Sequence, residues 1–165
     1  MTDPIRAVAG AATADERAVL EAFLDFQRAI LVSKILGAAD ADARRRLVPS
    51  ETTLAGLLRH LTLVEDNWFE RVLTGSMPAH EGPDRSWAVG PDDTVESLVA
   101  AYRAQCARSR ETAARYGLDH TGSHPQLGRV SLRWMYVHMV EETARHAGHA
   151  DILREQLDGT TGALP

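Results

Sequence analysis

Hydrophobic residues recur every three or four positions in four long segments of the chain. In residues 54–73 the apolar positions are Leu54, Leu57, Leu61, Val64, Trp68 and Val72, which is the spacing of one face of an amphipathic helix. The other three segments are residues 13–37, 92–117 and 130–157, and no segment has a convincing strand pattern. The hydrophobic pattern therefore predicts an all-α fold, a four-helix bundle.

Capping and helix-breaking residues indicate where these helices begin and end. Residues Thr13 to Glu16 have the pattern of a capping box for the first helix, and Thr52 or Thr53 is expected to cap the second. A short helix is expected across residues 40–47. The loop of residues 75–91 is long enough to run the length of the bundle, so we expect a crossover connection between the second and third helices.

The length and composition are those of one globular domain. With 165 residues, of which 44% are hydrophobic and 25% charged, the chain can bury a single sizeable core. We expect the domain to span residues 13–159 and the termini, residues 1–12 and 160–165, to be flexible. The formal net charge of -5 argues against a dedicated nucleic-acid binder.

The sequence also favours a protein of the reducing cytoplasm. Residues 1–12 lack a basic start followed by an apolar run, so we expect no signal peptide. No apolar stretch is long enough to cross a bilayer. The single cysteine, Cys106, cannot form an internal disulfide, and its helical neighbourhood predicts a half-buried, inert thiol.

The most informative polar residues lie near the end of the fourth predicted helix. At about 100° per residue, Glu142 and His146 lie one turn apart and roughly 40° around the axis, with His149 between them. Two donors at this spacing can reach one metal ion without distorting the helix. His60, at the edge of the apolar stripe of the second helix, offers a third ligand. Three protein ligands leave a coordination position open, as in reactive metal sites.

The same residues could instead be core side chains that are satisfied by local hydrogen bonds. Their arc of the fourth helix also contains methionines and a leucine, so these donors are expected to face the core. A buried carboxylate without a partner is costly, and a divalent cation is an efficient partner for it. The spacing alone leaves both interpretations open. We expect core packing for Trp68, Trp134, Met135 and Met139. The loop residues His120 and His124 are expected to be solvated. Arg28 is expected either at the site or on the surface.

Two segments resemble the DinB-like (DinB/YfiT-like) superfamily. They are TLAGLLRHL at residues 53–61 and ETARHAGHAD at residues 142–151, and the resemblance extends from Arg17 to Gly159. It is closest to the branch with the ETARHAGHAD signature, which is related to the N-terminal domain of mycothiol-dependent maleylpyruvate isomerase. The resemblance implies a four-helix bundle in which three side chains hold a divalent metal ion, often zinc or nickel.

Carried over residue by residue, the resemblance implies that His60, Glu142 and His146 are the metal ligands. Many members of the superfamily have histidine at the position of Glu142, whereas the maleylpyruvate isomerase branch has glutamate. Many members have glutamine where this chain has His149. The resemblance therefore leaves three roles for His149: an outer partner of a ligand, an added ligand, or a base near the metal.

The resemblance further implies a transferase of low-molecular-weight thiols. The metal would hold a thiol such as mycothiol or bacillithiol as the thiolate, which attacks an electrophilic small molecule. We expect a pocket open at one end of the bundle and lined by Met135, His138 and His149. A non-catalytic bundle that binds a metal or a small molecule, and a metal-dependent hydrolase, are the alternatives. Trp87, in the otherwise polar loop of residues 75–91, and the often dimeric superfamily suggest a homodimer.

Overall fold

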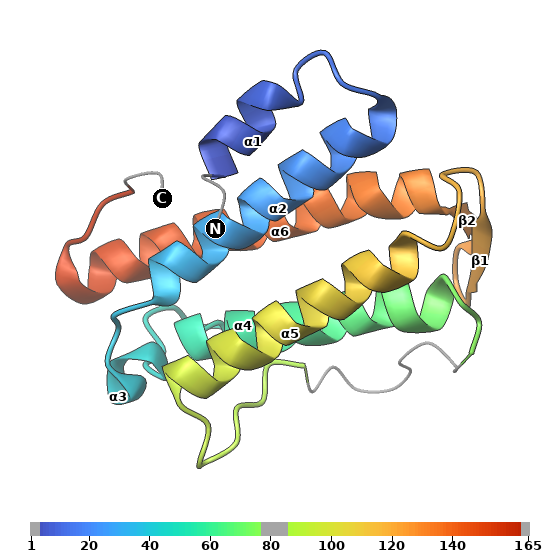
Figure 1. Cartoon of the computed structure of the whole chain (residues 1–165). Coiled ribbons are helices and arrows are strands. Elements are labelled where there is room, and N and C mark those ends of the chain that lie inside the picture. The colour runs from blue at the N-terminus through green and yellow to red at the C-terminus, as the bar shows by residue number, and fades with distance from the viewer. Residues whose placement is uncertain (1–3, 77–85, 163–165) are drawn as a thin grey trace.

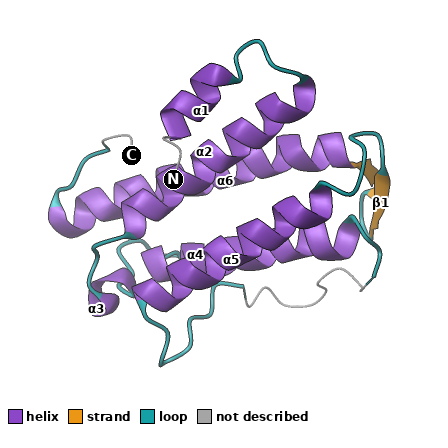
Figure 2. Ribbon diagram, in the orientation of Figure 1, coloured by secondary structure: helices purple, strands orange, loops and turns teal. Residues whose placement is uncertain are grey.

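The computed structural model describes residues 4–76 and 86–162, and most of them are helical (Figure 2). In chain order the elements are α1 Pro4–Gly10, α2 Glu16–Ile35, α3 Asp40–Ala43, α4 Leu54–Glu65, the π-helix η1 Asp66–Val72, α5 Val95–Ala113, β1 Thr121–His124, β2 Gly128–Ser131 and α6 Leu132–Asp158. None of the helices in these ranges is long and apolar enough to cross a membrane.

The long helices pack as two pairs that run in opposite directions (Figure 1). In the first pair, α2 and α6 are parallel: the Tyr136 hydroxyl donates to Glu21 near one end, and Lys34 pairs with Asp151 near the other, each at 3.0 Å. The second pair is α4 and α5, which also share one direction. The end of η1 and the start of α5 therefore lie at opposite ends of the helices, as a crossover connection requires.

Two apolar clusters fill the space between the helices, one toward each end. The first joins α2, α4, α5 and the later part of α6, and the second joins the start of α2, η1 and the first turns of α6. Fully buried members are Leu31, Ile35, Leu57, Leu58 and Leu61 in the first cluster and Leu24, Leu132, Met135 and Met139 in the second. This confirms the core positions predicted for Met135 and Met139.

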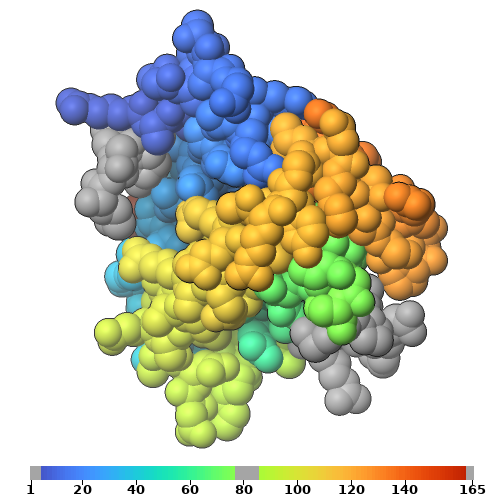
Figure 3. Space-filling view, turned by 45° about the vertical axis from the view of Figure 1, so that its right-hand side comes forward, coloured from blue at the N-terminus to red at the C-terminus, as the bar shows by residue number. Residues whose placement is uncertain are grey.

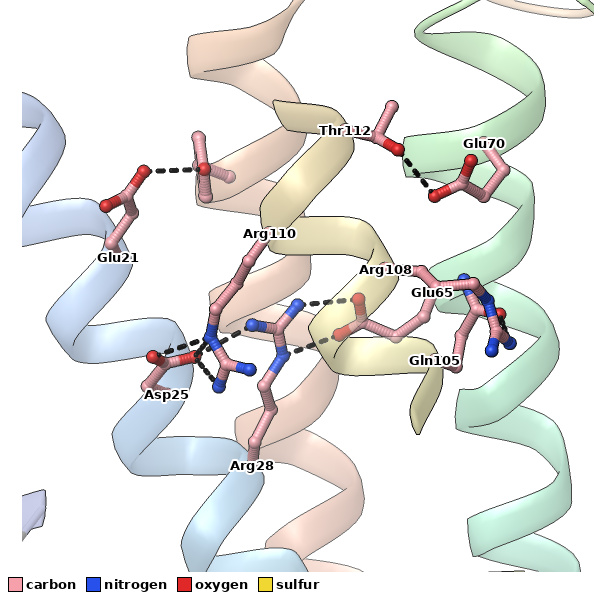
Figure 4. A network of polar contacts seen from close by, with 10 residues as sticks. Glu21, Asp25, Arg28, Glu65, Glu70, Gln105, Arg108, Arg110 and Thr112 are labelled. Atoms are coloured by element: carbon pink, nitrogen blue, oxygen red, sulfur yellow. Dashed lines mark hydrogen bonds and ion pairs between the residues drawn. The ribbon is translucent and has the colours of Figure 1, made fainter. Parts of the chain in front are cut away.

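A buried ionic network lies between these two clusters (Figure 4). The Glu65 carboxylate, fully buried on α4, accepts two hydrogen bonds from Arg28 of α2, at 2.7 and 2.6 Å. Arg28 also pairs with the Asp25 carboxylate at 2.8 Å. Arg110 of α5 pairs with the Asp25 carboxylate as well, at 2.6 Å. Burial alone would lower the pKa of Arg28, but the Glu65 carboxylate holds it well above its ordinary value. Arg28 therefore links α2 to α4 instead of lying on the surface.

Side chains cap the helices close to the expected boundaries. The hydroxyl of Thr53 accepts from the backbone N–H of Gly56 at 3.0 Å, so Thr53 is the cap of α4. The predicted capping box at Thr13 is wrong, because Asp15 caps α2 by accepting from Ala18 at 2.9 Å. The described part of the N-terminal segment contains helix α1, and its flexibility stays a prediction.

The prediction of a chain without strands is also wrong. Residues 121–131 form an antiparallel hairpin, in which β1 pairs with β2 (Figure 2). Each strand has only four residues, which is too short for alternation to be recognised in a sequence. The hairpin approaches the end of η1 very closely: a Cβ atom on Gly122 would lie 2.0 Å from the carbonyl oxygen of Val72.

This close approach also changes the surroundings of His124, one of two histidines that were expected to be solvated. The His124 ring stacks on Trp68, with ring centroids 5.0 Å apart and planes 13° apart. The His120 ring packs against Tyr116 at 4.3 Å. His124 is half-buried and belongs to the contact between the hairpin and the helices, so its predicted solvated position is wrong, whereas His120 is exposed as predicted.

The predicted second helix is continuous in space but changes its winding. After Glu65 the backbone forms the π-helix η1, whose wider turn is seen in the hydrogen bond from the Leu73 N–H to the Trp68 carbonyl at 3.0 Å. A π turn inserts one residue relative to an α-helix. As a result, both Trp68 and Phe69 are buried.

Candidate metal centre

Three residues that the sequence places on two helices come together between α4 and α6. His60 lies on α4, while Glu142 and His146 lie one turn apart on α6. One nitrogen or oxygen from each of them lies within 4.8 Å of those of the other two. The Nε2 atoms of His60 and His146 both approach the same carboxylate oxygen, Oε1 of Glu142, at 3.4 and 3.1 Å.

The three side chains are largely buried, but each keeps some contact with solvent. The side chains of His60, Glu142 and His146 are 13%, 15% and 8% exposed. Hydrogen bonds from His146 and His60 hold the pKa of the Glu142 carboxyl well below its usual range. Arg145 contacts the second oxygen, Oε2, at 3.4 Å. The carboxylate is therefore held ionised, with one oxygen directed at both imidazoles.

The donor set fits a divalent metal ion. Two imidazole nitrogens and one carboxylate oxygen are ligands found at catalytic zinc sites, and three of them leave a position open for a further ligand. All three atoms point to one place. In that arrangement His60, Glu142 and His146 could hold a metal ion.

Ser86 and Trp87 contact the His60 ring, and sequence reasoning did not assign either of them to the site. The Oγ of Ser86 lies 2.7 Å from Nδ1 of His60, on the side of the ring away from Glu142. The Trp87 ring stacks on the His60 ring, with centroids 4.2 Å apart and planes 7° apart. Spacing could not reveal them, because they come from the connection between the helices and not from a periodic segment.

His149 lies beside the three-residue group and not within it. Its Nδ1 lies 3.3 Å from Nδ1 of His146, the ring nitrogen that faces away from Glu142. The residue is exposed. Partial burial, together with the charge of His146, lowers the pKa of His149 from its ordinary value of 6.5.

Two of the residues predicted to line an open pocket, Met135 and His138, differ in their burial. Met135 is fully buried in the second apolar cluster, so its predicted place in an open pocket is wrong. His138 is half-buried, one turn before Glu142 on α6, and its burial lowers the pKa of the imidazole from 6.5.

The single cysteine contributes no nucleophile. Cys106 is buried in the first apolar cluster instead of half-buried as predicted. Burial raises the pKa of its thiol to about 12, so the thiol stays protonated near neutral pH. This confirms the prediction of an inert thiol.

The fold and the site define a class: a predominantly helical protein with a His-Glu-His group that could hold a metal ion between two of its helices. A family profile described as mycothiol-S-transferase matches residues 19–159. Because the match covers most of the chain, the protein belongs to the mycothiol S-transferase family, which is DinB-like and confirms the resemblance seen in the sequence. Comparison with curated proteins and with solved structures found no match.

Proposed function

We propose that the protein is a metal-dependent S-transferase that joins a low-molecular-weight thiol of the mycothiol type to an electrophilic small molecule. One observation carries this proposal: in a chain of the mycothiol S-transferase family, His60 and His146 direct their Nε2 atoms at one oxygen of Glu142. His60, Glu142 and His146 would hold zinc or nickel. A divalent ion bound there would lower the pKa of a thiol and so favour the thiolate near neutral pH.

The protein's own residues prepare this site for a metal ion. With a metal ion bound, the Nδ1–H of His60 would donate to the Oγ of Ser86, 2.7 Å away, and the Nε2 lone pair would be free for a ligand bond. Trp87 stacks on the same ring and restricts its rotation. Half-buried partners of this kind fix the orientation of ligand histidines before the ion arrives.

We assign His149 the role of a positioning residue for His146. Its Nδ1 is within hydrogen-bond distance of the outer nitrogen of His146, so it can fix the tautomer that presents Nε2 toward Glu142. The variant His149→Gln keeps a hydrogen-bonding group there, and we expect it to keep the metal. If His149 were instead a base, the variant would bind metal normally but lose the acidic limb of its pH–rate profile.

The same proposal includes the wider organisation of the protein. We place the site in a single DinB/YfiT-like four-helix bundle over residues 13–159, in the cytoplasm, where a low-molecular-weight thiol is kept reduced. A homodimer stays a prediction, and sedimentation at micromolar concentration tests it. Trp87 contributes less to that prediction than expected, because it covers His60.

The direct test is thiol consumption by the metal-loaded protein. We expect turnover of an electrophile with mycothiol, less or none with glutathione or bacillithiol, and loss of turnover in His146→Ala. The matched control is Glu141→Gln, which changes the neighbouring exposed carboxylate outside the group. Bound metal without any thiol-dependent turnover would contradict the proposal and favour a non-catalytic binding bundle. Turnover that consumes water but no thiol would favour a hydrolase.

A further inference from the structure

Four aromatic and imidazole rings gather where the hairpin meets the helices. They are Trp68 of η1, His124 of β1, and Trp134 and His138 of α6. Trp68 stacks on His124 at 5.0 Å and meets the edge of His138 at 4.8 Å. Trp134 stacks on His138, with centroids 5.2 Å apart and planes 16° apart, and is tilted against Trp68 at 5.4 Å. We call these four residues the ring cluster.

Only part of the ring cluster is buried. Trp68 is 6% exposed, but Trp134 is 41% exposed, so its predicted place in the core is wrong. Two more large apolar side chains are exposed in the same part of the chain, Leu127 at 53% and Val137 at 56%. In Figure 3 the hairpin and the start of α6, in orange, lie beside the end of η1, in green. Exposed apolar surface of this kind is typical of a binding site.

The ring cluster continues the face of α6 that carries the candidate metal centre. Trp134, His138, Glu142 and His146 follow one another at intervals of four residues. Residues four apart on a helix are neighbours, with Cβ atoms about 6 Å apart. A ligand that lies on Trp134 and His138 therefore has one edge directed toward Glu142 and the proposed place of the thiol sulfur.

We propose that the ring cluster binds the electrophilic substrate, and that this substrate is a flat conjugated molecule such as an aryl-substituted enone. The proposal rests on the proposed thiol transfer for its chemistry. The four side chains offer ring faces and edges, which attract a further aromatic ring, and none of them is a carboxylate, lysine or arginine. A second copy of the chain could also cover this surface, but the direct continuity with the metal centre favours a small substrate.

The reaction with such a substrate needs no further reactant. The thiol sulfur forms a bond to the β-carbon of the enone, and the electron pair of the carbon–carbon double bond moves to the α-carbon. The α-carbon then takes up one proton, which replaces the proton that the thiol released. Nothing leaves the molecule and nothing is oxidised, so thiol and enone combine in a single adduct.

A matched pair of substrates tests the role of the rings. The enones 4-phenyl-3-buten-2-one and 3-penten-2-one differ in a phenyl group in place of a methyl group. We expect Trp134→Leu to lower the ratio of their kcat/KM values roughly tenfold, mainly through the KM of the phenyl enone. Trp134→Phe should restore most of the ratio. The control Phe23→Leu removes an aromatic side chain of α2 that is equally exposed, at 42%, and should leave the ratio unchanged.

A binding measurement separates this proposal from the proposed function. The saturated ketone 4-phenyl-2-butanone cannot react with a thiol, and its binding to the metal-free protein can be followed by ligand-detected NMR. We expect binding to the wild type, Trp134→Phe and Phe23→Leu, and its loss in Trp134→Leu. If no thiol turnover is found, the proposed function fails, but this binding pattern would still support the ring site.

Two results would overturn the ring site. One is an unchanged substrate ratio, or unchanged ketone binding, in a Trp134→Leu protein whose circular dichroism is that of the wild type. The other is a dimer that Trp134→Leu converts to a monomer while the substrate ratio stays the same, which would make this surface a subunit contact.

Discussion

Removing Glu65 should be among the most damaging single changes in this protein. Its carboxylate is fully buried and accepts two hydrogen bonds from Arg28, which is only 6% exposed. In Glu65→Leu the guanidinium would stay buried with Asp25 as its remaining acidic partner, and that side chain is 40% exposed. Breaking a buried ion pair from one side costs about 3–5 kcal/mol. Because Asp25 compensates in part, we expect a loss of about 3 kcal/mol.

The double variant Arg28→Met, Glu65→Leu provides the contrast. It removes both charges together with their desolvation cost, and such replacements are often close to neutral. We therefore expect the double variant to recover most of the stability that Glu65→Leu loses. A second control is Arg46→Ala, because Arg46 and Glu51 form a surface pair with side chains 60% and 70% exposed. Breaking that pair should cost less than about 1 kcal/mol.

Urea unfolding followed by circular dichroism measures all three changes. The reasoning would be refuted if Glu65→Leu cost no more than Arg46→Ala, or if the double variant were as unstable as Glu65→Leu. The network also bears on the site, because Glu65 follows His60 on α4 by little more than one turn. A Glu65→Leu protein that still folds should bind metal more weakly than the double variant does.

Three further predictions concern the site and the hairpin. Ser86→Ala should lower the affinity for zinc by about 10- to 100-fold, measured by competition with a chelator, and an unchanged affinity would show that the contact with His60 is incidental. In the metal-free protein, the lowered pKa of Glu142 stabilises the fold fully above the ordinary value of 4.5, and this contribution decreases as the pH falls toward the lowered pKa. The difference in unfolding free energy between wild type and Glu142→Gln should therefore shrink below about pH 4.5, and a constant difference would contradict this. Gly122→Ala should lower the unfolding free energy by about 1–3 kcal/mol, because its Cβ would overlap the Val72 carbonyl. Gly148→Ala, where nothing lies within 4 Å of the added Cβ, should instead be neutral or stabilising in thermal unfolding.

The long helices and the three site residues could be read from the sequence because both depend on helical periodicity. The apolar stripe of residues 54–73 places His60 at the edge of the core. The spacing of Glu142 and His146 then puts both of them on one face of α6. These are local rules, and they hold wherever a helix is long enough for its pattern to repeat.

The features that the sequence did not predict depend on contacts between distant segments. Gly122 has no local signal that distinguishes a loop from a strand packed against Val72. From the sequence alone, Arg28 could equally be a surface charge. Only the fold shows that it pairs with Glu65. Ser86 and Trp87 lie in a non-periodic connection, so only the packing of that connection against α4 shows that they hold His60.

Metal content, followed by thiol binding to a cobalt-substituted protein, tests the central claim most directly. We expect about one divalent ion per chain in the wild type and in the control His120→Ala, and little in His60→Ala or His146→Ala. Adding mycothiol to the cobalt form should produce a thiolate-to-cobalt absorption band, with release of a proton. An unchanged metal content in His146→Ala, or a cobalt spectrum that does not respond to the thiol, would contradict the account.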